Sequence, residues 1–110
     1  MRMWMVNPEL MCDKHLLGEH GELHKFLHNW QKQQTMTKRI LDNAIEPKSY
    51  KKRHDQLAAE LLRRNFNHQS PIEQPDFSYL PVEEQNFIID VNNNYLRLVE
   101  RCEKCRKMKK

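Results

Sequence analysis

Apolar residues recur with helical spacing along most of this 110-residue chain, and no alternating run is long enough to predict a sheet. A first helix is predicted from Asp13, a possible N-cap, to about Gln33. Its apolar face consists of Leu16, Leu17, Leu23, Leu27 and Trp30. A short second helix is predicted over Thr37–Ala44, because Pro47 follows soon after it.

Two further helices are predicted in the second half of the chain. One follows Ser49 and ends near residues 65–67. It would bury Leu57, Ala58, Leu61 and Leu62. A polar segment interrupted by prolines separates it from a last helix, which opens at Pro81. The inward residues of this last helix would be Phe87, Ile88, Val91, Tyr95, Leu98 and Val99. The predicted fold class is all-α, with three main helices in a single compact domain spanning residues 1–110.

The first six residues, MRMWMV, are largely apolar although they precede every predicted helix. The termini of most domains fray. A terminus as apolar as this one is expected to pack between the helices instead. Such packing would hold the α-amino group of Met1 in a defined place.

Positive charge is concentrated in the second half of the chain. The net charge is +4, and clusters of lysine and arginine occur at residues 51–53, at residues 63–64 and in a tail from about residue 101. Such clusters are typical of surfaces that bind a phosphate backbone. No segment approaches the roughly 18 apolar residues that a membrane span requires, and the polar residues 7–9 argue against a signal peptide. We therefore expect a cytoplasmic protein with an anionic partner.

Residues 13–26 combine the only two glycines of the chain, Gly18 and Gly21, with the carboxylates Glu19 and Glu22. Glycine inside a helix costs about 1 kcal/mol relative to alanine. The sequence therefore predicts that a backbone or a ligand approaches the helix closely at this point. A carboxylate beside such an opening is a candidate for chemistry.

Two patterns raise the alternative of a metal site. His20, His24 and His28 recur every four residues and would share one helix face, a geometry that can hold zinc or nickel. Cys102 and Cys105 form a C-x-x-C pair, but no second ligand pair at a suitable spacing was identified. The three cysteines also make no disulfide framework. The prediction is therefore that the protein needs no metal or other cofactor.

An N-terminal amine beside a helix carboxylate would support imine chemistry. The pKa of an α-amine is about 7.7–8.0, against about 10.4 for lysine, so a larger share of it is neutral and nucleophilic at pH 7. Neutral amines attack sugar C1′ carbons or carbonyls and form imines. Glu22 could stabilise the resulting cation and then move protons.

The segments MRM, LMCDKHLLGEHGELHKF, HDQLAAELLRRNFN and YLP together resemble the pyrimidine dimer DNA glycosylases of the phage endonuclease V type. The resemblance covers most of the chain and is most specific in H-L-x-x-E-x-x-E-L and R-R-x-F-N. It implies an all-α enzyme without a metal, whose N-terminal α-amine and one helix glutamate act through a Schiff base. The implied partner is damaged double-stranded DNA, and we expect the protein to be a monomer.

The resemblance also implies particular site residues. Met1 would supply the amine and Glu22 the catalytic carboxylate, because their separation in sequence matches that of the family's nucleophile and glutamate. Arg2 and His15 match positions close to the family's active site, and Arg97 matches a DNA-contacting lysine. Together with the charge clusters, this gives the predicted DNA-contacting residues: Arg2, Lys14, His15, Lys25, Lys51, Lys52, Arg53, Arg63, Arg64, Arg97 and Arg101.

Two departures from the family concern recognition. Lys25 replaces an arginine, which keeps the charge but loses the bidentate fork. Gly21 stands where the phage enzyme has an arginine that helps to recognise damage. Imine chemistry is therefore a firmer expectation than the choice of lesion.

The function predicted from the sequence is that of a DNA repair glycosylase with abasic-site lyase activity. Its substrate would be duplex DNA carrying cyclobutane pyrimidine dimers, and its setting a prokaryotic or viral nucleoid. Two alternatives stay open at this point. One is a non-enzymatic basic DNA-binding module, and the other is a small metal-binding protein that uses the histidines or cysteines.

Overall fold

The computed structural model describes residues 2–27, 30, 32, 35–66 and 71–108. Within these residues the structure contains no strand and three helices of seven or more residues, α1 (Asp13–Lys25), α4 (Tyr50–Arg63) and α6 (Val91–Arg101). The shorter elements are η1 (Pro8–Leu10), α3 (Thr37–Leu41), η2 (Pro47–Ser49), α5 (Val82–Gln85) and α7 (Glu103–Lys107). The predicted all-α class with three main helices is confirmed.

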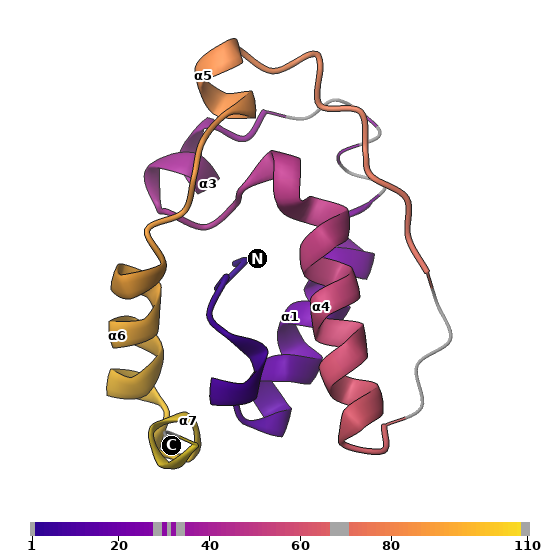
Figure 1. The fold of residues 1–110 in the computed structure, drawn as a ribbon. Coiled ribbons are helices and arrows are strands. Elements are labelled where there is room, and N and C mark those ends of the chain that lie inside the picture. The colour runs from indigo at the N-terminus through magenta and orange to yellow at the C-terminus, as the bar shows by residue number, and fades with distance from the viewer. Residues whose placement is uncertain (1, 28–29, 31, 33–34, 67–70, 109–110) are drawn as a thin grey trace.

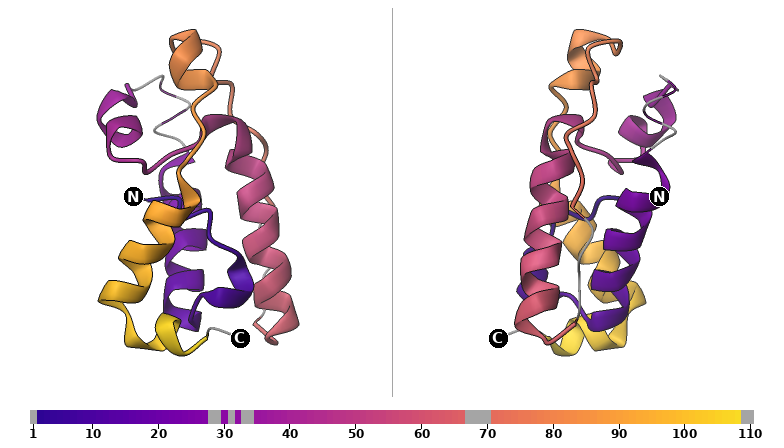
Figure 2. Two further views of the ribbon diagram at one scale, coloured as in Figure 1. Left: turned by 60° about the vertical axis from the view of Figure 1, so that its left-hand side comes forward. Right: turned by 90° about the vertical axis from the view of Figure 1, so that its right-hand side faces the viewer.

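The N-terminal segment, residues 2–7, lies in the middle of the molecule, with α6 on one side and the packed pair α1 and α4 on the other (Figure 1). The α3 and α5 helices lie at one end, and α7 lies at the other (Figure 2). Met3 and Val6 are buried in the same core as Leu16, Leu57 and Leu98. The N-terminal segment therefore joins the three main helices. None of the described helices is long and apolar enough to cross a membrane.

Three helix ends differ from the predicted ones. The first helix, α1, ends at Lys25, where the N–H of the C-cap Phe26 bonds back to carbonyls of the last turn. The predicted end at Gln33 lies outside the described residues. The short α3 ends at Leu41 and α4 at Arg63, before two asparagines, Asn43 and Asn65, with φ values of 57° and 70°. Asparagine adopts this left-handed conformation more readily than most residues, and it stops a helix.

The predicted last helix is broken into two. It was expected to start at Pro81 and run on, but α5 ends at Gln85 and α6 starts only at Val91. Asp90 caps α6 by accepting a hydrogen bond from the Asn93 N–H at 3.2 Å. The extended residues between the two helices turn Ile88 outward with 69% exposure, while Ile89 is buried. Within α6, Val91 is 40% exposed and the fully buried positions are Asn94 and Leu98.

A buried ion pair connects the main elements of the core. The Arg53 guanidinium of α4 donates from Nε and Nη2 to both carboxylate oxygens of Glu19 on α1, at 2.6 and 2.9 Å. Its Nη1 donates to the Val6 carbonyl at 2.8 Å. Burial raises the pKa of the Glu19 carboxyl, and the hydrogen bonds from Arg53 and from the backbone of Trp4 act in the opposite direction. The pair thus joins α4, α1 and the N-terminal segment.

Loss of Arg53 should therefore destabilise the fold strongly. Arg53→Met would leave the Glu19 carboxylate buried without its partner, and breaking one side of a buried pair costs about 3–5 kcal/mol. The free energy of unfolding can be measured by urea denaturation, with Lys52→Met as a control because Lys52 is exposed. The double variant Glu19→Leu with Arg53→Met should recover most of the loss. A loss below about 1 kcal/mol in Arg53→Met would contradict the role given to the pair.

Candidate functional site

A pocket of about 490 Å³ opens between the N-terminal segment and α1. Its lining residues come from residues 2–4 of the segment and from the first three turns of α1. They are Arg2, Trp4, Lys14, His15, Gly18, Glu19 and Glu22. Four side chains named from the sequence, Arg2, Lys14, His15 and Glu22, thus come together at one opening. Of these, Lys14 is exposed, and the other three are half-buried.

The N-terminal segment is held at the pocket by hydrogen bonds from two sides. The Met3 N–H donates to the Ala44 carbonyl at 2.7 Å. Arg2 donates from Nη1 to the Asp42 carbonyl at 3.0 Å and to Asn94 Oδ1 at 3.0 Å. The buried Asn94 amide in turn donates to the Met3 and Trp4 carbonyls, at 3.3 and 3.2 Å. The loop after α3 and the α6 helix therefore fix where the segment lies.

The pocket lining contains two cations, Arg2 and Lys14, beside the carboxylates of Glu19 and Glu22. Burial lowers the pKa of Arg2, and the charges of Arg97 and Arg101 on α6 lower it further. Burial, aided by the charge of Lys14, also lowers the pKa of the neighbouring His15. The Arg2 guanidinium carbon lies 5.5 Å from the centre of the Trp4 ring, which it faces. An anionic ligand that entered here would meet cations contributed by the segment, by α1 and by α6.

The glycines leave the neighbouring surface of α1 open. A Cβ atom added at Gly18 or Gly21 would meet no described atom within 4 Å, apart from the helix's own backbone and chain neighbours. The predicted close approach of another backbone is therefore wrong for the part of the chain that the structure describes. Gly18 lines the pocket, so a close approach by a ligand remains a prediction for this position.

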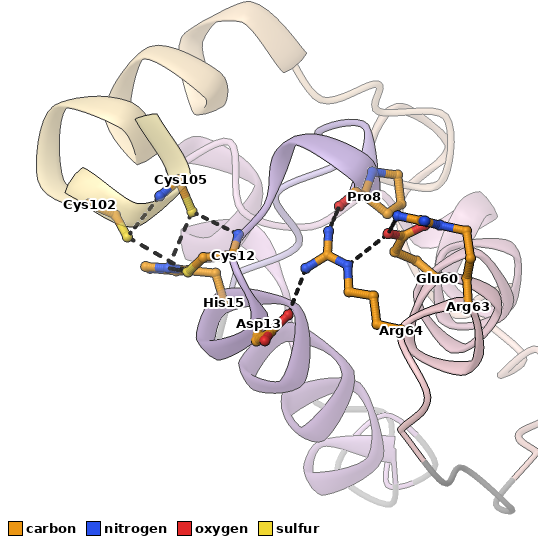
Figure 3. Close-up of polar contacts among 9 residues, drawn as sticks. All are labelled: Pro8, Cys12, Asp13, His15, Glu60, Arg63, Arg64, Cys102 and Cys105. Carbon is orange, nitrogen blue, oxygen red and sulfur yellow. Dashed lines mark hydrogen bonds and ion pairs between the residues drawn. The ribbon is translucent and has the colours of Figure 1, made fainter. Parts of the chain in front are cut away.

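Arg53 does not belong among the DNA-contacting residues. Its side chain is 1% exposed and is held by Glu19, so it cannot reach a phosphate without breaking the core. Arg64 is also committed to protein contacts, with Asp13, Glu60 and the Pro8 carbonyl (Figure 3). Arg63 pairs with Glu60 as well.

The other predicted contacts lie outside the pocket lining. Lys51 and Lys52 are exposed at the start of α4, and Lys51 pairs with Asp55 at 2.7 Å. Lys25 is exposed at the end of α1, with its ammonium 5.8 Å from the centre of the Phe26 ring. Met1, the predicted nucleophile, lies outside the described residues.

The structure contains two groups of potential metal ligands whose members differ from the predicted ones. His20 and His24 come together with His54 of α4, and the ligand atoms of the three lie within 4.8 Å of one another. His28, the predicted third member, lies outside the described residues. The second group joins the C-x-x-C pair to Cys12 and His15. Cys12 and His15, spaced as C-x-x-H, are therefore the second ligand pair that the C-x-x-C motif lacked.

Other residues of the site also carried a sequence signal. Arg53 stands three residues after Tyr50 and four before Leu57, so it falls on the apolar face of α4. Asn94 stands four residues before Leu98 on the inward face of α6. A polar side chain at an inward helical position must find a buried partner. That rule would have marked both residues as structural.

The fold and the pocket together define a small all-α protein. Its N-terminal segment shares one pocket with Glu22 of α1 and with the cations Arg2 and Lys14. The sequence model of the pyrimidine dimer DNA glycosylases matches residues 1–74, which is more than half of the chain. The chain therefore belongs to the pyrimidine dimer DNA glycosylase family. A comparison with curated proteins and one with solved structures gave no match.

Proposed function

We propose that this protein removes a damaged base from duplex DNA and then cuts the strand at the abasic site, through a Schiff base on the α-amine of Met1. The observation that carries the proposal is the gathering of Arg2, Lys14, His15 and Glu22 around one pocket beside the N-terminal segment. Family membership implies the class of enzyme and damaged DNA as its substrate. The nucleophile, the carboxylate and the lyase step are parts of the proposal that go beyond family membership.

The position of the N-terminal segment supports Met1 as the nucleophile. Arg2 lines the pocket and is fixed by hydrogen bonds to the loop after α3 and to Asn94 of α6. Met1 is bonded to Arg2 in the sequence, and Arg2 is one of the residues that line the pocket. An α-amine has a lower ordinary pKa than a lysine side chain, so a larger share of it is neutral and nucleophilic at pH 7.

The glycosylase step would replace one bond to C1′ by another. The amine lone pair forms the N–C1′ bond, and the glycosidic bond breaks with its electrons leaving on the base, which then takes up a proton. The amine then loses a proton and its lone pair forms the C1′=N bond, while the C1′–O4′ bond breaks and O4′ takes up a proton. The product is an imine, which is cationic when protonated. Glu22 lines the same pocket and would stabilise that cation.

The strand cut would follow from the same imine. Removal of a proton from C2′ moves electrons toward the imine, and the C3′–O bond breaks to release the phosphate. Glu22 is proposed as the group that accepts and returns protons in these steps. Arg2 and Lys14 would pair with phosphates at the pocket mouth, with Arg97 and Arg101 extending that surface along α6. Binding should therefore weaken as salt concentration rises.

Borohydride trapping tests the proposed function. The untagged protein is mixed with duplexes that contain a thymine dimer, an abasic site or no damage, and borohydride reduces any imine to a stable adduct. We expect an adduct with the dimer duplex and with the abasic duplex but none with undamaged DNA. An adduct on the abasic duplex alone would retain the imine chemistry and remove the dimer as substrate. Binding without an adduct on either would contradict the proposal and favour the DNA-binding module.

Glu22→Gln tests the carboxylate. Proton transfer by a positioned side chain typically contributes about 10²- to 10⁴-fold in rate, so single-turnover cleavage of the preferred duplex should fall by at least about 100-fold. Urea denaturation should show little change, because Glu22 makes no ion pair among the described residues. Glu83→Gln, an exposed change on α5, is the matched control. Wild-type rates in Glu22→Gln would refute the assignment.

A further inference from the structure

Four potential metal ligands from the two ends of the chain converge in one place (Figure 3). Cys12 immediately precedes α1, and His15 lies in the first turn of that helix. Cys102 separates α6 from α7, and Cys105 lies within α7. The ligand atoms of all four residues lie within 4.8 Å of one another. Cys12 and Cys105 are buried, and the other two are half-buried.

Three distances between the ligand atoms match those around a single tetrahedral ion. Cys12 Sγ lies 3.7 Å from Cys102 Sγ. His15 Nδ1 lies 3.3 Å from Cys12 Sγ and 3.6 Å from Cys105 Sγ. Around tetrahedral zinc, with Zn–S near 2.3 Å and Zn–N near 2.0–2.1 Å, two sulfurs stand about 3.8 Å apart and a sulfur and a nitrogen about 3.5 Å apart. All the remaining distances between the four ligand atoms are at most 4.8 Å.

Backbone N–H groups are directed at two of the sulfurs. The Cys12 N–H points at Cys105 Sγ at 3.2 Å, and the Cys105 N–H points at Cys102 Sγ at 3.4 Å. Hydrogen bonds of this kind hold metal-ligating groups in a fixed orientation. The four residues also have the spacing of paired zinc ligands, C-x-x-H and C-x-x-C.

The chemistry of the donors selects among possible occupants. All three cysteines are free thiols. An iron–sulfur cluster needs its irons and sulfides between the cysteines, which would hold the ligands farther apart than direct sulfur–sulfur contact. A tetrahedral set of three sulfurs and one nitrogen is typical of zinc. With four protein ligands there is no open position for water or substrate, as in zinc sites that support folding.

We propose that Cys12, His15, Cys102 and Cys105 bind one structural zinc ion. The ion would fasten the α6–α7 junction to the start of α1. Cys102 and Cys105 lie outside the residues 1–74 that match the family, so this second half of the site is not part of the matched region. Because His15 also lines the pocket, the ion would orient that imidazole with Nδ1 on the metal and Nε2–H free to donate.

Elemental analysis of the purified protein is the first test. The chain should be produced without a polyhistidine tag, which would itself bind metal, and dialysed against metal-free buffer. We expect one zinc per chain. Replacement of zinc by Co²⁺ should give the intense visible absorption of a tetrahedral, thiolate-ligated cobalt ion. No zinc in the purified protein, together with no cobalt spectrum when Co²⁺ is added to the reduced protein, would overturn the proposal.

Variants locate the ion. Cys102→Ser should weaken zinc binding by more than the roughly 10- to 100-fold that follows loss of a ligand's hydrogen-bond partner. The matched control is His20→Gln with His24→Gln, which disrupts the histidine cluster and should retain the zinc. Zinc kept by Cys102→Ser but lost by the histidine variant would overturn the proposal in favour of the second cluster.

Wild-type protein provides a test that does not depend on a variant folding. Removal of zinc by a strong chelator should lower the melting temperature, and added zinc should restore it, because the ion binds only the folded arrangement. An unchanged melting temperature after zinc has been removed would exclude a structural role. The imine chemistry itself uses no metal, so adduct formation with borohydride can be scored separately in zinc-loaded protein.

Discussion

The buried ion pair between Arg53 and Glu19 is the interaction on which the rest of this structure depends. One guanidinium binds both oxygens of a carboxylate on α1 and a carbonyl of the N-terminal segment. Because both groups are almost fully removed from water, each needs the other to offset the cost of burial. The bond from Arg53 to the Val6 carbonyl places the segment beside the two helices. The pocket exists where these elements meet.

Asn94 complements the ion pair from the opposite side of the segment. Its amide bonds the carbonyls of residues 3 and 4 and its oxygen accepts from Arg2. A chain terminus is ordinarily mobile, whereas catalysis by a terminal amine requires a fixed one. In this fold, α4 and α6 supply the polar partners that hold the segment, and α1 supplies the carboxylate. The zinc site would add a further link between α1 and α6, at the end where His15 meets the pocket.

The sequence was sufficient for the helical class, the three main helices and the placing of Glu22 beside the N-terminal segment, because these follow from apolar spacing and a family resemblance. The sequence was a less reliable guide for arginine, which can be either an exposed cation or the partner in a buried ion pair. Arg53 was grouped with its lysine neighbours as a surface cation, although its position on the apolar face of α4 indicates burial. The cysteine cluster was missed because its halves are 90 residues apart, as the Cys12–Cys102 contact shows. The break before α6 depends on the cap by Asp90 and on the hydrogen bond from the Ile89 N–H to Glu46. The spacing of apolar residues carries no information about such hydrogen bonds.

We propose that the segment held by Arg53 and Asn94 delivers an α-amine, and not a side-chain amine, to the damaged sugar. Lys14 lines the same pocket and is the alternative source of a Schiff base. Proteolysis of the borohydride-trapped complex, followed by mass spectrometry of the DNA-bearing peptide, distinguishes the two amines directly. We expect the adduct to lie on the α-nitrogen of Met1. An adduct on Lys14 Nζ would contradict the assignment of the α-amine as nucleophile.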